Sequence, residues 1–292
     1  MDPLNSTFKI EQVIKTANII VGYKQFLGLD IEKYFNGLDE IILYKCKETD
    51  YRYFGPEFIA GTGDFYEQLQ QFNWYYQKDK WEFKITRPLL ESGKLLEIGC
   101  GSGEFLQSLK IIEKLKLYGT EFNPQAISDG IKKGLNISNL DIKQIETNSY
   151  DYIIAFQVLE HIANANDFFT NCKRILKPNG KLIIGVPNCK SLVFMPFSSL
   201  YYYDGSLLLN LPPHHMGWWT KKSLKMMGKR HNFSFEKCYF EPLPEFRKPL
   251  VDRNLRILLK ISFIHKIFRK FLYHYYEKLF KGETILVVYK KK

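Results

Sequence analysis

The chain of 292 residues is predicted to fold as an α/β protein, with helices on both faces of a mostly parallel sheet. Two observations support this prediction. The apolar segment at residues 94–98 is typical of a buried strand, and the glycine-rich turn Gly99–Gly103 connects it directly to a helical segment. Further along the chain, short apolar segments rich in β-branched residues alternate with helical ones, which is the pattern of β-α-β units.

The composition fits a protein with a sizeable core and no disulfides. Hydrophobic residues make up 45% of the chain. The five cysteines are scattered without a C-x-x-C pair, so we expect neither a disulfide framework nor a metal site. The N-terminus lacks a basic segment followed by an apolar one, and no segment is long and uncharged enough to span a bilayer. The sequence therefore predicts a cytoplasmic protein.

The formal net charge of +11 raises the question of an anionic partner. Lysine, isoleucine and asparagine are abundant throughout the chain, so part of this charge follows from a composition bias. The basic residues concentrate near the C-terminus, where residues 253–281 are a candidate for contact with a membrane. Nucleic acid is not an expected partner, because no D/N-P-P-Y/F segment follows the fourth predicted strand.

The first predicted strand and its turn carry the pattern E-x-G-x-G-x-G from Glu97 to Gly103. Glycine lets the backbone turn sharply and lets a ligand approach where a Cβ would clash. The first amides of the next helix lack intrahelical partners and are free to face that ligand. A dinucleotide site would need G-x-G-x-x-G, and Glu97 would repel a pyrophosphate. The site instead suits a ligand with an ammonium or sulfonium group.

A helix at residues 105–115 and a second strand at residues 117–121 follow the turn. In a nucleotide-binding sheet, an acid at the end of this strand accepts hydrogen bonds from both ribose hydroxyls, which is the role expected for Glu121. Phe122 is expected to lie against the adenine. Asn123-Pro124 is expected to cap and start the next helix.

The third and fourth strands are predicted at residues 137–142 and 149–156. The first of these makes Asp141 a candidate acceptor for the adenine amino group. Side chains at the carboxyl ends of parallel strands face the ligand crevice. Gln157 and His161, which follow the fourth strand, are therefore expected near the ligand.

The fourth strand is followed by the segment V-L-E-H at residues 158–161 and by a predicted helix at 167–176. The turn L-K-P-N-G and a fifth strand at 181–188 come after this helix. Together with E-x-G-x-G-x-G, this order resembles class I S-adenosylmethionine-dependent methyltransferases, which usually carry L-K-P-G-G at the turn. Asparagine tolerates the positive φ that glycine adopts there. The resemblance implies a Rossmann-like, seven-stranded, mostly parallel sheet with an antiparallel last strand, and S-adenosylmethionine as the cofactor. The predicted cofactor-binding residues are Glu97, Gly99, Cys100, Gly101, Gly103, Glu121, Phe122, Asp141 and Gln157.

Two regions are expected, an N-terminal cap or lid at residues 1–86 and a methyltransferase domain at residues 87–292. The domain is expected to carry acceptor-side insertions at residues 189–219 and 247–281. The cap is predicted to be helical. This expectation rests on four apolar side chains that fall on one helical face, namely Phe65, Leu69, Phe72 and Tyr76. That helix is expected to pack on the sheet of the first strand, to act as a lid over the methionine end of the cofactor, or to do both.

The insertion at residues 189–219 is too long and too aromatic for a plain connection. It contains P-P-H-H at residues 212–215, followed by W-W-T. This part is similar to a group of bacterial methyltransferases often associated with sugars and surface glycans. The similarity implies that the insertion binds the methyl acceptor.

A hydroxyl acceptor benefits from a general base, and histidine titrates near the working pH. The predicted catalytic candidates are His161, His214 and His215. The alternative for His161 is packing behind Glu160. The alternative for His214 and His215 is a pair that stabilises the loop, and at most one of the two is expected to reach the acceptor.

The C-terminal part is predicted to contain a helix from the capping residue Thr220 to Lys229, a sixth strand at residues 233–240 and a seventh at residues 284–289. The last strand is expected to join the sheet antiparallel. Residues 253–281 form an amphipathic pattern with basic residues beside an apolar stripe. This helix is expected either to pack on the protein or to lie on an anionic membrane at the inner membrane face.

The leading functional prediction is methyl transfer to an oxygen of a small molecule or of a sugar or surface-glycan precursor. Two alternatives stay open. One is a quinone or lipid methyltransferase at the membrane surface, because V-L-E-H and Lys190-Ser191 also resemble that branch. The other is a protein that binds S-adenosylmethionine without catalysing a reaction.

Overall fold

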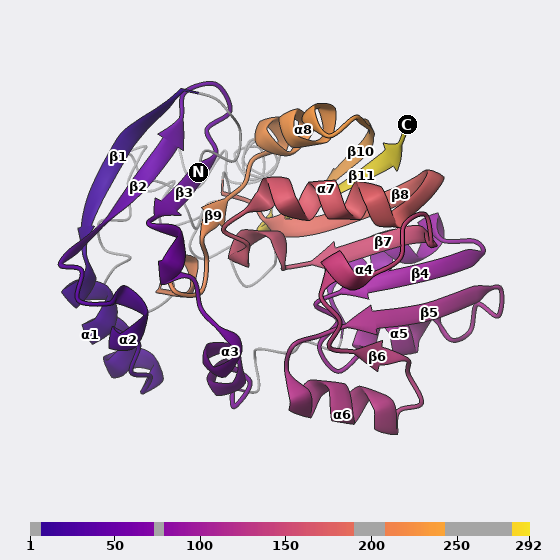
Figure 1. The fold of residues 1–292 in the computed structure, drawn as a ribbon, viewed down its shortest axis with the longest axis horizontal. Coiled ribbons are helices and arrows are strands. Elements are labelled where there is room, and N and C mark those ends of the chain that lie inside the picture. The colour runs from indigo at the N-terminus through magenta and orange to yellow at the C-terminus, as the bar shows by residue number, and fades with distance from the viewer. Residues whose placement is uncertain (1–6, 73–78, 190–207, 243–281) are drawn as a thin grey trace, which may run out of the picture.

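A computed structural model describes residues 7–72, 79–189, 208–242 and 282–292, which form two sheets and the helices around them (Figure 1). The larger sheet has seven strands in the order β6-β5-β4-β7-β8-β11-β10 within these residues. Strands β6, β5, β4, β7 and β8 are parallel, and β11 lies antiparallel between β8 and β10. The predicted seven-stranded sheet with an antiparallel last strand is confirmed. The strands are β4 (Gly93–Ile98), β5 (Leu115–Thr120), β6 (Ile137–Ser138), β7 (Tyr150–Phe156), β8 (Leu176–Pro187), β10 (Phe233–Phe240) and β11 (Thr284–Lys291).

The register of the central strands brings their carboxyl ends to one edge of the sheet. Ile98 of β4 is paired with Thr120 of β5 on one side and with Ala155 of β7 on the other. The loops that follow these three strands therefore start side by side. This is the edge at which ligands bind in open parallel sheets.

Both faces of the sheet are covered, as the near-continuous apolar strands require. Neighbouring residues such as Ile153 and Ile154 point to opposite faces and belong to separate buried clusters. Helices α7 (Ala165–Ile175) and α8 (Lys221–Arg230) cover one face. Helices α4 (Trp81–Thr86) and α5 (Glu104–Leu109) cover the other.

Two predicted helix starts are confirmed by their caps. Helix α6 (Pro124–Lys132) begins after Asn123, whose side-chain oxygen accepts hydrogen bonds from the backbone N–H groups of Gln125 and Ala126. Helix α8 begins after Thr220, which forms a capping box with Ser223. Strand β10 coincides with the predicted sixth strand.

Three predicted boundaries were wrong. The third strand has only Ile137–Ser138, because Asp141 already caps the 3-10 turn η3 (Ile142–Gln144) and the chain leaves the sheet. Helix α5 ends at Leu109 instead of residue 115, because Leu115 already pairs with Gly93 at the start of β5. Strand β8 begins at Leu176, so the predicted turn of residues 177–180 lies within the strand, with Asn179 at a positive φ of 65°.

The prediction of a helical N-terminal cap was wrong. The region contains a four-stranded antiparallel sheet in the order β1-β2-β3-β9. Its strands are β1 (Phe8–Lys15), β2 (Glu40–Cys46), β3 (Arg52–Gly55) and β9 (Gly217–Trp218). The helices are α1 (Thr16–Leu27), α2 (Glu32–Phe35) and α3 (Gly63–Leu69), with the 3-10 turns η1 (Glu57–Ile59) and η2 (Arg87–Leu89) nearby in the chain. Strand pairing across some 30 residues satisfies the backbone here, and no local pattern predicts it.

The acceptor-side insertion is built into this N-terminal region. Its described part contributes β9 to the sheet, the 3-10 turn η7 (Leu208–Asn210), and the buried side chains of Leu211 and Met216 to the N-terminal core. Helix α3 packs in the same core through Phe65 and Leu69, and not on the sheet of β4 as one prediction had it. Figure 1 shows this region beside the carboxyl ends of the parallel strands.

The two sheets are joined by aromatic and polar contacts at the start of α8. Trp219 is fully buried, and its ring lies 4.3 Å from that of Tyr51, which precedes β3. The hydroxyl of Thr220 donates a hydrogen bond of 2.7 Å to the carbonyl of Thr49. These contacts hold the N-terminal sheet against the α8 side of the larger sheet.

Two predictions concern segments outside the described residues. The amphipathic helix expected at residues 253–281 falls outside the described residues. Residues 190–207 of the acceptor-side insertion also fall outside them. Among the helices that are described, none is long and apolar enough to cross a membrane.

Trp219→Ala is expected to lower the free energy of unfolding by about 3–5 kcal/mol, because the substitution leaves a cavity where the two sheets meet. Urea unfolding measures this change. Phe58→Ala is the control, because Phe58 is 57% exposed, and it should change stability by no more than about 0.5 kcal/mol. Equal, small effects of the two substitutions would contradict a joining role for Trp219.

Candidate functional site

The glycine loop has the left-handed backbone that the sequence pattern indicates. Gly99, Gly101 and Gly103 have positive φ angles of 65°, 54° and 78°. A Cβ at Gly99 would lie 2.6 Å from the Val158 side chain, and one at Gly103 would lie 2.3 Å from Leu135. Neither position tolerates a side chain, so the loop keeps a bare backbone along the sheet edge.

Cys100 was predicted to bind the cofactor, and its side chain is buried between the loop and β5. Its sulfur lies 3.6 Å from the carbonyl oxygen of Gly101, and a Cβ added at Gly119 would lie 2.5 Å from that sulfur. Burial also raises the pKa of the Cys100 thiol, so the group is uncharged. Any contact of Cys100 with a ligand would therefore come from its backbone.

Glu97 is a buried carboxylate at the end of the central strand. It is 4% exposed, and its Oε2 atom has no hydrogen-bond partner among the described residues. Burial raises the pKa of Glu97 well above its usual value, while the positive charge of Lys80 opposes this shift. A buried carboxyl oxygen without a partner among the described residues is able to accept from a cationic group, and this role of Glu97 stays a prediction.

Glu121 fixes the glycine loop to the end of β5. Its Oε2 accepts a hydrogen bond of 2.9 Å from the N–H of Gly101, and its Oε1 accepts bonds of 2.8 and 3.0 Å from the N–H groups of Phe122 and Asn123. A carboxylate has about four acceptor sites, so roughly one remains for a ribose hydroxyl. Phe122 is 66% exposed and lines an open groove of about 540 Å³ together with residues of α6 and β6.

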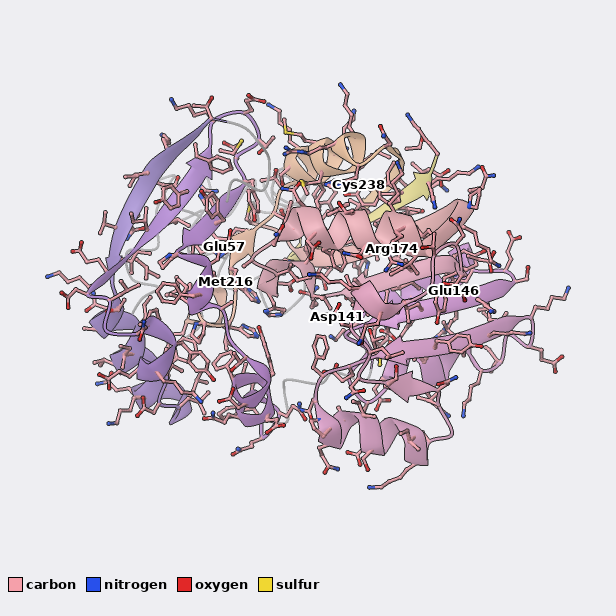
Figure 2. The ribbon with its side chains drawn as sticks, in the orientation of Figure 1. Glu57, Asp141, Glu146, Arg174, Met216 and Cys238 are labelled. Atoms are coloured by element: carbon pink, nitrogen blue, oxygen red, sulfur yellow. The ribbon has the colours of Figure 1, made fainter. Side chains whose placement is uncertain are left out.

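Asp141 lies at the side of the larger sheet that faces the N-terminal region, whereas Met216 lies on the facing part of that region (Figure 2). One oxygen of Asp141 accepts a hydrogen bond of 2.8 Å from the N–H of Lys143. This bond caps the 3-10 turn η3. The backbone N–H of Asp141 in turn donates to the side chain of Gln144. The role of Asp141 toward an adenine amino group stays a prediction.

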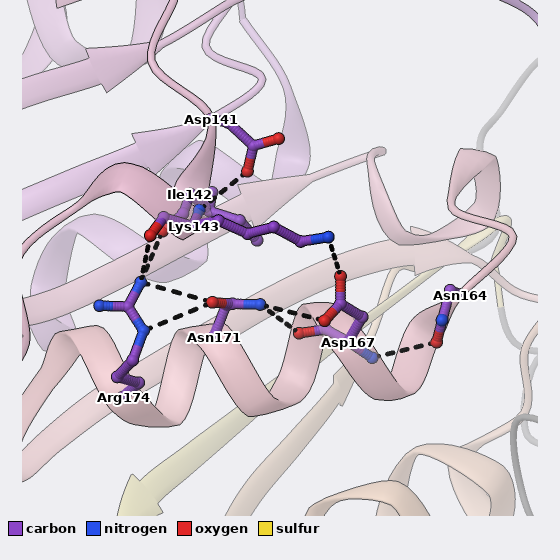
Figure 3. Close-up of polar contacts among 7 residues, drawn as sticks. All are labelled: Asp141, Ile142, Lys143, Asn164, Asp167, Asn171 and Arg174. Atoms are coloured by element: carbon purple, nitrogen blue, oxygen red, sulfur yellow. Dashed lines mark hydrogen bonds and ion pairs between the residues drawn. The ribbon is translucent and has the colours of Figure 1, made fainter.

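Arg174 of α7, which the sequence did not single out, holds this turn in place (Figure 3). Its guanidinium donates hydrogen bonds to the carbonyls of Ile142 at 2.8 Å, Lys143 at 3.2 Å and Ile145 at 2.5 Å. The side chain of Asn171 supports the guanidinium from within the helix. A planar group with five donors is suited to several carbonyls at once. Arginine near the end of a predicted helix was the only local signal.

Gln157, predicted to bind the cofactor, is engaged by a neighbouring side chain. Its amide donates a hydrogen bond of 2.7 Å to Oε1 of Glu82, a buried residue of α4. Gln157 also has a positive φ of 54°, and its N–H donates to the carbonyl of Gly185. Sequence analysis missed Glu82, although an acid between Trp81 and Phe83 in an aromatic helix is an unusual pattern.

Lys80, also missed, provides a positive charge for the acidic part of the site. Its charge opposes the burial effect on the pKa of both Glu97 and Glu160. The same charge contributes to the lowered pKa of His161. Lys80 therefore lies close enough to Glu97 at the end of β4, and to Glu160 and His161 in V-L-E-H, to affect the charge of all three side chains.

The structure brings the three predicted histidines together. His161 belongs to the 3-10 turn η4 (Leu159–His161) after β7, whereas His214 and His215 come from the acceptor-side insertion. Their ring centroids are 4.5–4.9 Å apart. Tyr66 of α3 packs edge-on against His161. Both insertion histidines therefore lie beside His161, and the expectation that at most one of them reaches the acceptor stays a prediction.

Burial keeps these imidazoles neutral near pH 7. It lowers the pKa of His161 to about 4 and the pKa values of His214 and His215 well below the usual value. Next to them, burial raises the pKa of Glu160 to about 8. Glu160 is 1% exposed, and neither of its carboxylate oxygens has a hydrogen-bond partner in the described part of the chain.

The histidine cluster and the glycine loop share one sheet edge. Strands β4 and β7 are adjacent and end together, and Val158, three residues before His161, contacts Gly99. The site thus consists of acids beside a glycine loop and a group of neutral bases next to them. Such an arrangement can hold a cationic nucleoside-type ligand and activate a hydroxyl beside it.

Fold and site together define the class of protein as a Rossmann-like methyltransferase that uses S-adenosylmethionine. Comparison with known families agrees with this class, since the family described as "Methyltransferase domain" matches residues 70–237. This stretch covers more than half of the chain, and the chain belongs to that family. The predicted family, its fold and its cofactor are confirmed at this level.

Curated relatives match only part of the chain. The chain is 31% identical over 103 residues to a ubiquinone biosynthesis O-methyltransferase from Rickettsia prowazekii, covering 32% of this chain and 40% of the relative. A second one, from Xanthomonas oryzae, is 24% identical over 122 residues, covering 37% of this chain and 48% of the relative. The chain therefore spans less than half the length of these relatives.

Solved structures share the fold over more of the chain. An S-adenosylmethionine-dependent methyltransferase from Archaeoglobus fulgidus superposes with a TM-score of 0.57 at 19% identity, covering 77% of this chain and all of that one. Phosphoethanolamine N-methyltransferase 2 from Haemonchus contortus, in complex with S-adenosyl-L-methionine, gives a TM-score of 0.54 at 16% identity, covering 97% of this chain and 68% of that one.

Glu97→Gln is expected to stabilise the ligand-free protein at alkaline pH and to weaken cofactor binding. The folded-state pKa of Glu97 is raised above the ordinary value of 4.5, so the folded chain retains a proton that the unfolded chain has released. Stability therefore falls as pH rises from that value through the folded pKa. The substitution should flatten this fall, which urea unfolding at acidic and alkaline pH measures.

The same substitution should weaken S-adenosylmethionine binding by about 1.5–3 kcal/mol, because a hydrogen bond to a charged group is lost. Titration calorimetry measures this loss. An unchanged pH dependence of stability together with unchanged affinity would remove Glu97 from the site.

Glu121→Ala is expected to weaken S-adenosylmethionine binding by about 1.5–3 kcal/mol, because it removes the ribose acceptor and frees the loop amide of Gly101. Glu113→Ala is the matched control, since Glu113 is exposed and lies before β5. NADH should not bind either form. Unchanged affinity of the Glu121 variant in titration calorimetry would contradict its role, and micromolar binding of NADH would contradict the cofactor assignment.

Proposed function

We propose that this protein transfers a methyl group from S-adenosylmethionine to an oxygen of a small molecule or of a sugar or surface-glycan precursor. The single observation that supports oxygen as the acceptor atom is the group of three neutral histidines at the carboxyl end of β7. A hydroxyl must lose its proton on methylation, and a neutral imidazole can accept it.

The residues present fit the cofactor. Glu97 offers a buried carboxyl oxygen to a cationic group, and Glu121 retains an acceptor site for a ribose hydroxyl beside the groove that Phe122 lines. Asp141 follows β6, and we propose that its carboxylate accepts from the adenine amino group. The glycine loop leaves room beside them. When bound, S-adenosylmethionine supplies an electrophilic methyl group on a sulfonium.

The role of the histidine group would be to orient the acceptor and to remove its proton. Orientation is worth up to about 7–11 kcal/mol in well-aligned reactions. His161 is 17% exposed through its side chain, whereas His214 and His215 are each 7% exposed as whole residues, so His161 is the ring that an acceptor would reach first. Tyr66 and the N-terminal core behind it would wall this side of the pocket.

A second candidate function is methylation of a quinone or lipid. It is supported by the curated relatives, which are named ubiquinone biosynthesis O-methyltransferases. A hydroxyl acceptor and a base would serve this reaction equally well, so the two candidates differ in the acceptor and not in the chemistry of the histidines. The third candidate, a protein that binds the cofactor without turnover, would use only the glycine-loop half of the site.

An acceptor screen separates these candidates. The full chain is incubated with methyl-labelled S-adenosylmethionine and with separate sugar and glycan, lipid and quinone, and RNA fractions of a cell extract. Label in the sugar and glycan fraction supports the proposal, and label in the lipid fraction supports the second candidate. Cofactor binding without label in any fraction would overturn methyl transfer.

His161→Gln is expected to lower kcat by about 100-fold or more, the usual contribution of a general base, while cofactor affinity stays nearly constant. Stopped assays with the acceptor fraction and calorimetry measure the two quantities. His231→Gln is the control, because His231 packs on Phe169 of α7, outside this group. If His161→Gln keeps the wild-type rate across pH, the proton is lost to solvent and the proposed base role fails.

A further inference from the structure

The hydrogen bonds of the three histidines fix which ring nitrogens carry protons. Nδ1 of His161 lies 2.6 Å from the carbonyl oxygen of His214, and Nδ1 of His214 lies 2.7 Å from that of Leu209. A carbonyl only accepts, so each Nδ1 carries the proton and donates. In a neutral ring the lone pair then lies on Nε2, which is the tautomer typical of metal-binding histidines whose other nitrogen is held by a carbonyl.

A buried carboxylate faces this lone pair. Oε1 of Glu160 lies 3.9 Å from Nε2 of His161, which is too far for a hydrogen bond. Both oxygens of Glu160 lack a hydrogen-bond partner among the described residues, and the residue is 1% exposed. Two acceptor groups that face each other in a buried place require a cation or a proton between them.

The remaining ligand atoms are close enough to share an ion. One ring nitrogen from each of His161, His214 and His215 lies within 4.8 Å of the others, in the described part of the chain. With Zn–N distances of about 2.0–2.1 Å and tetrahedral angles, ligand nitrogens lie roughly 3.4 Å apart, so the rings would have to close by about an ångström on binding. Nδ1 of His215 is buried without a partner among the described residues, which leaves that ring a free ligand atom.

We propose that His161, His214 and His215 bind a divalent transition-metal ion of the zinc class, with the carboxylate of Glu160 beside this group. Imidazole is a ligand that this class prefers, and three protein ligands are usual where such an ion also binds a further oxygen. The sequence predicted no metal site, because its five cysteines are scattered without a C-x-x-C pair. The ligands are instead histidines from two segments that lie 53 residues apart at His161 and His214.

The metal would deepen the proposed function, on which this step rests. An imidazole whose free nitrogen binds the ion cannot also accept a proton, so with metal bound the histidines would hold the acceptor oxygen through the ion and the proton would pass to solvent. A bound divalent ion lowers the pKa of a ligated hydroxyl or water strongly. The acceptor would then be one whose oxygen can reach the buried side of His161.

Metal binding is tested without cofactor or acceptor, so its failure is distinct from failure of methyl transfer. The full chain is dialysed against a chelator and titrated with Co²⁺, followed by competition with Zn²⁺. We expect a single equivalent of Co²⁺ with the visible absorption bands of a low-symmetry site, and their loss on addition of Zn²⁺. A folded protein that shows no such bands and no Zn²⁺ binding would overturn the proposal.

Variants assign the ligands. His215→Gln and Glu160→Gln are expected to lower Zn²⁺ affinity by more than about tenfold, which is the smallest loss usual even for groups that only support a ligand. Glu160→Gln is nearly isosteric and keeps the measurement informative if the histidine variant fails to fold. His231→Gln should bind as the wild type does. Equal Zn²⁺ binding by all three variants would place the metal elsewhere and refute this site.

Discussion

The register of three parallel strands is the constraint on which the rest of the site depends. Because Ile98 is paired with both Thr120 and Ala155, the loops after β4, β5 and β7 leave the sheet at one level. A slip of one residue would turn Glu97 from its buried place to the opposite face of the sheet. The hydrogen bond that the N–H of Gly101 donates to Glu121 then secures two of these loops to each other. The cofactor half of the site is therefore a product of strand pairing.

Burial sets the chemistry at this edge. Glu97 and Glu160 are 4% and 1% exposed, and each has an oxygen without a hydrogen-bond partner among the described residues. Such burial lowers stability, since a carboxylate loses its hydration and gains no equivalent contact. Buried acids of this kind with raised pKa values are typical of sites at which a ligand binds and stabilises them. The same low exposure keeps the nearby histidines neutral, so buried acids and neutral bases occur at one edge of the sheet.

The sequence predicted the parallel half of the fold well because each element there has a local signal. The strand and glycine turn, the Asn123 cap, the apolar β7 and the Thr220 cap are all readable within a few residues. The N-terminal sheet was missed because its first strand, β1, buries only one side chain fully. Because most side chains of β1 are exposed, the strand has no buried face that a period-2 pattern would indicate. Its partner β2 follows only after a connection that contains helices, so the pairing has no local signal either. Arg174 and Glu82 were missed for a related reason, because their partners are distant in sequence.

The acceptor half of the site differs from the cofactor half in what holds it together. His161 is on the larger sheet, but its Nδ1 is bound by the carbonyl of His214, and the carbonyl of Glu160 accepts from the N–H of Met216. Met216 is buried in the N-terminal core and directly precedes β9, which completes the N-terminal sheet. The histidine group therefore forms only when both cores are folded and joined. Since the glycine loop and the acids beside it belong to the larger sheet alone, changes in the N-terminal sheet and its insertion can alter the acceptor pocket while leaving the cofactor half intact. This division gives a physical reason why the cofactor is readable from the local sequence, whereas the histidine group depends on contacts between distant segments that no local pattern predicts.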